Sequence, residues 1–538
     1  MAAGVTVSYY CKKPCGQFVG HSPSSHPYFV GKLEPRQQQA VAFRGSSVRR
    51  CNITALFSWG SKKSVKPKDF TFSLGEFTLP DPASASASEE SKQLFPQKVS
   101  ISIVSSINEV PSDEWDACNL DATTPQKFNP FLSHAFLSSL EDSGSAVKET
   151  GWVPSHMVAK DAQGHVLGVV PLYLKSHSYG EFVFDHSWAD AYYNFGARYY
   201  PKFQCCVPFT PVTGPRILVR NSSVKDQVFD VLVSALKELT VKSQVSSLHI
   251  TFASEKEWLK LKGKGFLQRT GMQYHWKNRN YKSFDEFLMD LKANKRKHIR
   301  QERKKISAQN LKMKRLRGYE IKAKHWDSFY KFYRNTTDNK WGSAYLTRDF
   351  FHIMGAKMGD QVLLVTAEEG DELVAGALNL VGGDTLFGRL WGCRPDVYYP
   401  NLHFEACYYQ VRTDHVSAFS LCSFVRMTML CNFGGSWDFA FDQDVDYMIC
   451  CLLLPDLGLL AIEAAIELSL NTVEAGAQGE HKIQRGYLPV KTYSCHYLID
   501  EGFRKAIQAF LVQETDQVEL VMKLWGDSGP FKEGIVIE

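Results

Sequence analysis

A repeated order of strand and helix patterns constrains this chain more than any other feature. From Val99 the sequence predicts a strand, two helices, two strands, a long aromatic loop, a helix and a strand. Further along, the helices "KHWDSFYKFYRNTT" and "TRDFFHIMGAKM" precede three strands, a helix from His403 and the strand "NTVEAG". Because helices that alternate with strands pack on the faces of a sheet, the pattern predicts a mixed α/β fold built from two copies of one unit.

The length agrees with more than one domain, since the chain has 538 residues and single cores rarely grow that large. We expect a first domain at 99–285, a second at 286–512 and a C-terminal tail at 513–538. No apolar run reaches the roughly 18 residues that a membrane helix needs. We therefore expect no membrane span.

The N-terminal residues differ from the rest in charge. Residues 1–68 contain eleven Lys and Arg against one acid, Glu34, and are rich in Ser and Gly without an apolar h-region. This composition is typical of an organelle transit peptide and predicts cleavage near Cys51 and a location in the chloroplast stroma. A disordered basic tail is the alternative. The Ser/Ala/Glu-rich stretch within 69–98 predicts a flexible linker.

A second unusual segment, 411–460, interrupts a helical pattern. It contains neither Lys nor Glu but four Cys. When it is skipped, the apolar residues of 402–410 and 461–467 form one stripe at helical spacing. We interpret the segment as a retained intron or alternative exon, with a true insertion loop as the alternative.

Several enzyme and metal classes are disfavoured by missing motifs. The thirteen cysteines predict neither a zinc knuckle nor a disulfide framework, and we assign no metal. GxSxG, Walker and Rossmann motifs are missing, which argues against hydrolases, NTPases and dehydrogenases.

Long stretches of the sequence carry a family resemblance. They include "FDHSWADAYYNFGARYYPKFQCCVPFTPVTGPRIL", "DNKWGSAYLTRDFF", "LFGRLWGC", "LHFEACYYQ" and "VEAGAQGEHKIQRGYLPVKTYSCHYL". Together they resemble the FemAB-like family, the bacterial group labelled peptidoglycan biosynthesis/recognition among the GNAT-like N-acyltransferases. The resemblance runs from about Val99 to Val512 apart from the insert, and it implies two tandem GNAT-like folds.

The resemblance places Glu474 at the end of a strand, beside the cleft that opens in GNAT folds. Transfer to an amine needs a general base, and a carboxylate or histidine serves. We expect Glu474, Glu480 and His481 to deprotonate the amine and Tyr487 to protonate the leaving group. The substrate-binding candidates in the same stretch are Gln478, Lys482 and Arg485. An exposed charged loop is the alternative.

The donor side of this cleft is expected at "LFGRLWGCR". Alternation along a strand predicts that Arg389 and Trp391 share one face, with His403 and Glu405 opening the next helix. GNAT enzymes that use acetyl-CoA usually carry a glycine-rich loop here, whereas "RPDVYYPNLHFE" has no glycine. We expect no bound cofactor, and either acyl-CoA or an aminoacyl-tRNA as the acyl donor.

Two further clusters are candidates for substrate binding. Asp185, His186, Trp188 and Asp190 follow a strand in the first unit, and such an aromatic and acidic loop suits a sugar or an amine; a packed loop is the alternative.

The basic stretch 292–306 resembles the positively charged helix of Fem-type proteins. That resemblance implies that Arg296 and Arg300 meet the phosphates of a nucleotide-linked substrate or tRNA. A solvated helix face is the alternative.

These observations predict an N-acyltransferase that moves an acyl or aminoacyl group to an amine of a small molecule or peptide. The first alternative is a non-catalytic module that binds a glycan, a peptide or a nucleotide-linked ligand. The second is RNA binding through the basic stretch, which predicts affinity that falls steeply with salt.

Overall fold

The computed structural model describes residues 72–79, 98–340, 343–395, 399–404, 406, 462–475 and 480–533. The chain divides into the units Met1–Pro67 and Lys68–Glu538, and every described residue belongs to the second. The predicted transit peptide and the insert 411–460 lie outside the described residues. So do Glu405 and Gln478.

The first half of the described chain contains the predicted strands and helices in the predicted order, but the expected aromatic loop holds a helix and two short strands, and a strand at Phe72–Thr78, a helix at Glu255–Lys262 and a strand at Leu267–Lys277 were not predicted. Its strands are β1 (Phe72–Thr78), β2 (Lys98–Val104), β3 (Trp152–Pro154), β4 (His156–Lys160), β5 (Val166–Val170), β6 (Leu172–Lys175), β7 (Lys202–Cys205), β8 (Leu218–Val219), β9 (Ser247–Ala253) and β10 (Leu267–Lys277). Its helices are α1 (Ser112–Thr123), α2 (His134–Asp142), α3 (His186–Asn194), α4 (Lys225–Lys242) and α5 (Glu255–Lys262).

The second half repeats the order after two extra helices. Its helices are α6 (Phe284–Asp290), α7 (Ala293–Ser307), α8 (Ala323–Lys340), α9 (Arg348–Met358), α10 (Leu402–Phe404), α12 (Ile462–Glu467), the 3₁₀ helix η9 (Glu480–Arg485) and α13 (Glu501–Asp527). Its strands are β11 (Lys312–Arg317), β12 (Val362–Glu369), β13 (Glu372–Val381), β14 (Thr385–Cys393), β15 (Thr472–Glu474) and β16 (Leu488–Leu498).

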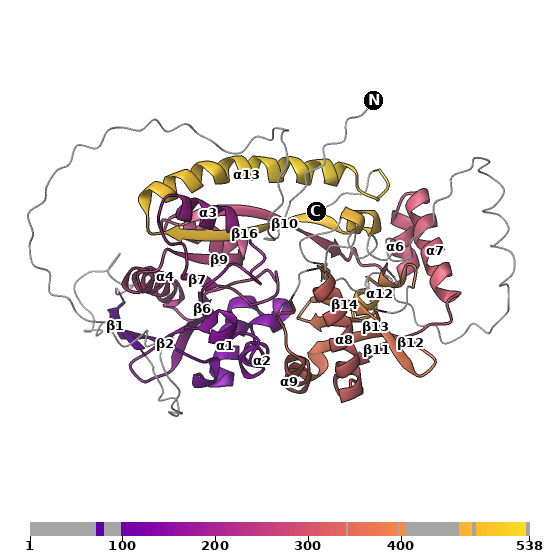
Figure 1. The fold of residues 1–538 in the computed structure, drawn as a ribbon, viewed down its shortest axis with the longest axis horizontal. Coiled ribbons are helices and arrows are strands. Elements are labelled where there is room, and N and C mark those ends of the chain that lie inside the picture. The colour runs from indigo at the N-terminus through magenta and orange to yellow at the C-terminus, as the bar shows by residue number, and fades with distance from the viewer. Residues whose placement is uncertain are drawn as a thin grey trace, which may run out of the picture. The chain divides into compact units, whose positions relative to one another are not determined.

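Two predicted boundaries differ from the structure. The expected linker 69–98 contains β1, which pairs antiparallel with β2 from Phe72 to Thr78. The expected tail from 513 begins inside α13, which continues to Asp527 and lies along β10 and β16 (Figure 1). Both segments bury apolar side chains, Leu74 in the first and Leu511 in the second, which explains why they fold with the body.

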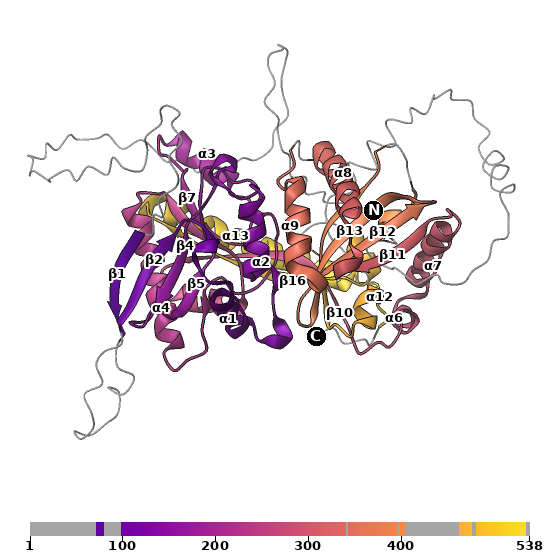
Figure 2. The ribbon, with the colours of Figure 1, turned by 90° about the horizontal axis from the view of Figure 1, so that it is seen from below.

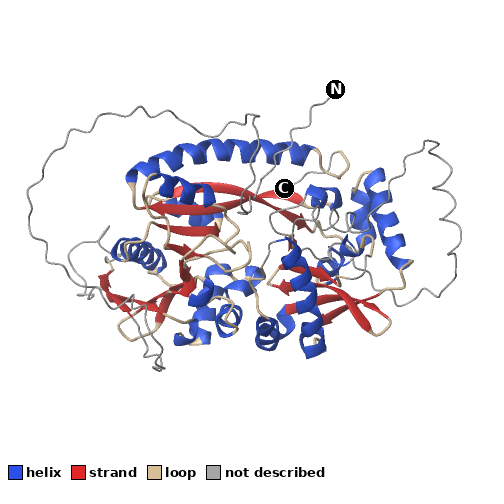
Figure 3. Ribbon diagram, in the orientation of Figure 1, coloured by secondary structure: helices blue, strands red, loops and turns tan. Residues whose placement is uncertain are grey.

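The strands form a mixed sheet that crosses from one half to the other. Its order is β11-β12-β13-β14-β15-β10-β16-β9-β7-β6-β3, beside a five-stranded sheet β1-β2-β4-β5-β8. Among the described strands all pairs are antiparallel except β7 with β9 and β14 with β15. Helices lie on the faces of these sheets (Figure 3), which confirms the predicted mixed α/β fold.

The last strands of the two halves are exchanged. β10 ends the first half but pairs with β15 of the second, while β16 ends the second half and pairs with β9 of the first. β10 and β16 also pair with each other along their length. Each half therefore needs a strand from the other to complete its sheet, and the two cannot be separated at the boundary near residue 285 without opening both.

Side chains from both halves share one core, which we call the junction core. Phe131 packs edge-on against Phe387 at 5.4 Å between ring centroids, and Phe136 against Phe350 at 5.8 Å. Here α2 and α9 face each other (Figure 2). The opposite face of the second-half sheet packs on a separate core that includes Trp276, Trp391 and Ile462.

No helix in the described ranges is long and apolar enough to cross a membrane.

Candidate functional site

The site begins where the parallel pair of the second half ends. Thr385 pairs with Thr472 and Phe387 with Glu474, but β15 stops at Glu474 while β14 continues to Cys393. On its other side β14 has a bulge, because Gly388 pairs with Asn379 and Leu390 with Leu378. Arg389 is the extra residue. A bulge of this kind redirects side chains and is common beside active sites.

The bulge overturns the prediction that Arg389 and Trp391 share a face. The Arg389 guanidinium lies over Phe131 at 4.9 Å and over Phe387 at 5.4 Å, on the junction-core side. Trp391 packs in the opposite core, edge-on to His403 at 5.4 Å between ring centroids. One inserted residue reverses the alternation of a strand, which the sequence pattern did not reveal.

Arg389 forms a buried ion pair with the predicted catalytic carboxylate. Its Nη2 lies 2.5 Å from Glu474 Oε1, and its Nη1 donates to the carbonyls of Gly388 at 2.8 Å and Glu474 at 3.3 Å. The backbone N–H of Thr213 donates to Oε1 at 3.3 Å, and the Thr213 hydroxyl donates to Oε2 at 2.9 Å. Glu474 is 2% exposed and Arg389 7%. In this arrangement Glu474 binds the two halves together, and its oxygens are already occupied.

A histidine missed in the sequence lies beside this pair. His275 of β10 is the register partner of Glu474, and its Nε2 lies 4.0 Å from Glu474 Oε2 and 3.3 Å from Gln273 Oε1. Burial lowers the pKa of His275 to about 4, so the imidazole is neutral near pH 7. The polar alternation of "MQYHWK" was the sequence signal that could have revealed it.

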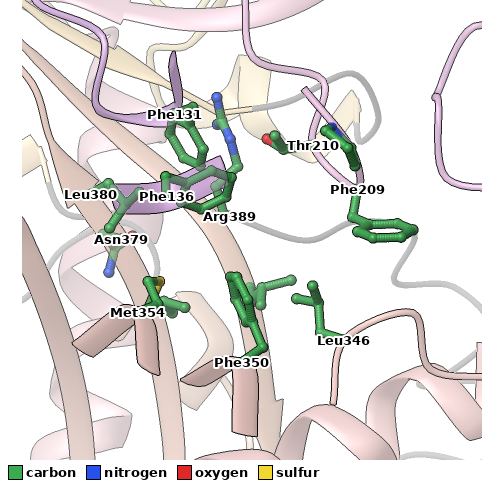
Figure 4. A pocket seen from close by; sticks show the side chains of 13 residues that line it. Phe131, Phe136, Phe209, Thr210, Leu346, Phe350, Met354, Asn379, Leu380 and Arg389 are labelled. Carbon is green, nitrogen blue, oxygen red and sulfur yellow. The ribbon is translucent and has the colours of Figure 1, made fainter. Parts of the chain in front are cut away.

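Two cavities that share lining residues lie at the junction core, and Arg389 lines the first of them. The first, the junction cavity, is lined by Arg389, Thr210 and mainly apolar side chains (Figure 4). The second, the mouth cavity, is lined by Phe182, Phe184 and Tyr345 among others. Both share Phe209, Leu346 and Leu390. Within the described part of the chain, no hydrogen-bond partner reaches the buried Arg389 Nε or Thr210 Oγ1.

The rest of the predicted catalytic stretch is largely buried. Tyr487 and Lys482 are fully buried, and the Lys482 ammonium donates to the Ala475 carbonyl at 2.7 Å. Arg485 pairs with Glu302 of α7 at 2.7 Å. Lys482 and Arg485 therefore hold the loop to its neighbours, contrary to the prediction that they contact substrate. Glu480 and His481 begin η9, and the described side chains do not include theirs.

The predicted cluster in the first half is not brought together. Asp185 is buried, and its Oδ2 accepts from Lys202 Nζ and from the Tyr199 hydroxyl, both at 2.5 Å. Burial alone would raise the pKa of Asp185, but the Lys202 ammonium outweighs it and keeps the pKa below its ordinary value. Trp188 is buried, whereas His186 and Asp190 are exposed on α3.

The basic stretch forms α7, and part of its charge is used within the fold. Arg296 Nη1 points to the carbonyls of Leu288 and Leu291 at the end of α6, at 3.5 and 3.4 Å. Arg300 lies 3.5 Å from Asp285 in an exposed ion pair. Ile299 packs in the core opposite the junction core. The structure therefore does not bring Arg296 or Arg300 to the face that carries Arg389 and Glu474.

The family model described as FemAB-like, peptidoglycan biosynthesis/recognition, matches residues 106–416 and 459–533. The chain belongs to the FemAB-like family. The matched residues of this FemAB-like chain leave out 417–458, which lie within the predicted insert 411–460. No curated protein matches its sequence.

Solved structures similar to the FemAB-like chain have low identity. The crystal structure of FemX has 10% identity and a TM-score of 0.41, with 74% of this chain and 98% of that chain covered. The C-terminal domain of a putative lysylphosphatidylglycerol synthetase from Agrobacterium fabrum has 7% identity and a TM-score of 0.38, with 75% and 95% covered. A tandem GNAT protein from the clavulanic acid biosynthesis pathway has 10% identity and a TM-score of 0.36, with 74% and 98% covered.

Proposed function

We propose that this FemAB-like chain is an N-acyltransferase that moves an acyl or aminoacyl group to an amine. The observation that carries the proposal is the unpartnered Nε–H of Arg389, buried beside a cavity at the bulge of β14. A fixed donor in apolar surroundings stabilises the negative charge that develops on an acyl oxygen during transfer. The Arg389 charge itself is balanced by Glu474, so the donor is held without further rearrangement.

The proton of the attacking amine needs an acceptor, and His275 fits this role better than Glu474. The imidazole is neutral, while both Glu474 oxygens already accept hydrogen bonds. In the proposed step the amine nitrogen forms a bond to the acyl carbon and its proton passes to His275; the bond to the leaving group then breaks, and the leaving group takes that proton from His275. Glu474, 4.0 Å away, stabilises the imidazolium.

Acyl-CoA and aminoacyl-tRNA are the candidate donors of the acyl group. The basic N-terminal residues support a plastid location.

The test is transfer activity of the full chain with panels of acyl-CoA and aminoacyl-tRNA donors and of amine acceptors. Arg389→Lys retains a cation for Glu474 but removes the Nε–H donor, so we expect kcat to fall about a hundredfold or more. Arg334→Lys, an exposed change on α8, is the matched control. Unchanged kcat in a folded Arg389→Lys protein would remove Arg389 from the mechanism.

A non-catalytic binding module is the second candidate, and one observation favours it. The oxygens of Glu474 are occupied by Arg389 and Thr213, so the carboxylate is not free to act as a base. A binding module predicts ligand-induced thermal shifts without turnover for every donor in the panel. Turnover with any donor that depends on Arg389 excludes it.

A further inference from the structure

We infer that the junction cavity binds a short, uncharged, apolar acyl group whose carbonyl oxygen accepts hydrogen bonds from Arg389 Nε and Thr210 Oγ1. The inference rests on the proposed function, since it names the chemical class of the group that is transferred. It is drawn from three properties of the cavity: two unpartnered donors, mainly apolar walls and a wall at Phe209 that it shares with the mouth cavity.

The two donors specify what the polar part of the ligand must be. Arg389 and Thr210 are 7% and 5% exposed, and within the described chain neither Arg389 Nε nor Thr210 Oγ1 has a partner. A buried polar group left unpaired costs about 1 to 3 kcal/mol. In Figure 4 the Thr210 hydroxyl points toward the Arg389 side chain. One carbonyl oxygen has two lone pairs and can accept from both groups, which relieves both costs.

The walls specify the rest of the ligand. The side chains of Phe131, Phe136, Phe350, Leu346, Met354 and Leu390 line the cavity and are all buried. Arg389 is the charged residue among the described lining residues, and Glu474 already neutralises it. A second charge would therefore be desolvated without a partner, at a large cost. The cavity selects an uncharged apolar group.

The wall at Phe209 that the two cavities share limits the length of that group. Phe209 lines both cavities and stacks on Tyr345 with ring centroids 5.3 Å apart. Its backbone has φ +61°, which is rare for a bulky residue, and its N–H donates to the Gly180 carbonyl at 2.9 Å. A side chain at Gly180 would come within 2.7 Å of the Phe209 ring. Phe209 is thus held as a partition, so the acyl group is short and its carrier remains on the side of the mouth cavity.

Small amides test this without knowledge of the donor, because an amide is the product of N-acyl transfer and has the same carbonyl acceptor. We would measure binding of isobutyramide, octanamide and succinamate to the full chain by saturation-transfer NMR. We expect isobutyramide to bind, and octanamide and the charged succinamate to bind at least tenfold more weakly. Thr210→Val removes one donor at constant shape and should weaken isobutyramide binding about tenfold.

Thr366→Val is the matched control, because Thr366 is also buried with a hydroxyl that finds no partner in the described chain but does not line either cavity. Met354→Trp fills the cavity and should abolish binding, and Phe209→Ala should admit octanamide; both are compared with wild type by circular dichroism. Binding of isobutyramide that survives Met354→Trp in a folded protein, or preference for succinamate, overturns the inference. Because binding is measured without turnover, the two failures can be told apart: unchanged kcat in a folded Arg389→Lys protein overturns the proposed function, whereas the binding results above overturn the inference.

Discussion

His275 and His496 occupy equivalent positions in the two halves. β10 and β16 pair antiparallel, with Leu267 opposite His496 and His275 opposite Leu488, so a two-fold relation about their centre exchanges the two histidines. The next strand brings Glu474 to His275 and His249 to His496. The duplicated position therefore carries a histidine–carboxylate pair next to Arg389 in one half, and a buried histidine pair, with Nδ1 atoms 2.7 Å apart, in the other.

This equivalence supplies a matched pair of variants. His275→Gln should lower kcat at least a hundredfold while the protein remains folded, because glutamine cannot accept the amine proton. His496→Gln, at the equivalent position, should lower the melting temperature and leave kcat of the folded protein within a few-fold. Equal loss of kcat in both variants would argue against a role for His275 in proton transfer.

The Arg389–Glu474 pair should show strong coupling in a double-mutant cycle. Arg389→Met and Glu474→Leu each leave one buried charge without its partner, and each should lower the free energy of unfolding by about 3 to 5 kcal/mol. The double variant should lose less than the sum of the two single losses. Urea denaturation followed by circular dichroism measures all four proteins. Additive losses would mean that the pair is not formed in the folded protein.

The buried neutral histidines predict a loss of stability in mild acid. Burial lowers the pKa of His249 to about 3 and that of His275 to about 4, below the ordinary value of about 6.5 in an unfolded chain. Between pH 6.5 and 4 the unfolded state therefore binds more protons. The free energy of unfolding should be highest above pH 6.5 and decrease as the pH falls toward 4. Urea titrations at several pH values test this, and the slope should lessen in a His249→Gln variant.

Removal of the buried Lys202 cation from beside Glu181 and Asp185 should change how the free energy of unfolding depends on pH. Lys202 Nζ lies 2.6 Å from Glu181 Oε1 and 2.5 Å from Asp185 Oδ2, and all three residues are buried. In Lys202→Met the two carboxyls lose their partner, so the pKa of Asp185 rises above its unfolded value and the pKa of Glu181, which burial already raises, rises further. The deficit in unfolding free energy relative to wild type should then be smaller at pH 5 than at pH 8. Lys242→Met, at an exposed ion pair, should show no such trend.

Deletion of 411–460 should leave the fold intact. Leu402 and Ala406 before the segment pack in the same core as Ile462 and Ile466 after it, and the family match omits most of the segment. We expect the shortened chain to have a melting temperature equal to or above that of the full chain. A shortened chain that fails to fold would show that the segment is an integral insertion. A single uninterrupted exon across 410–461 would separately exclude the retained-intron interpretation.

The sequence by itself determined most of the order of helices and strands, the duplication, the family and the choice of Glu474 and Arg389 as candidate site residues. Those follow from local patterns and from motifs that lie within one stretch of chain. It did not determine what these residues contact. The bulge that turns Arg389 away from Trp391 depends on the pairing of two strands, and the exchange of β10 and β16 brings His275 to Glu474. Thr213, Thr210 and Phe209 reach the site from the other half. Only tertiary structure decides such contacts, because register and burial depend on residues hundreds of positions apart.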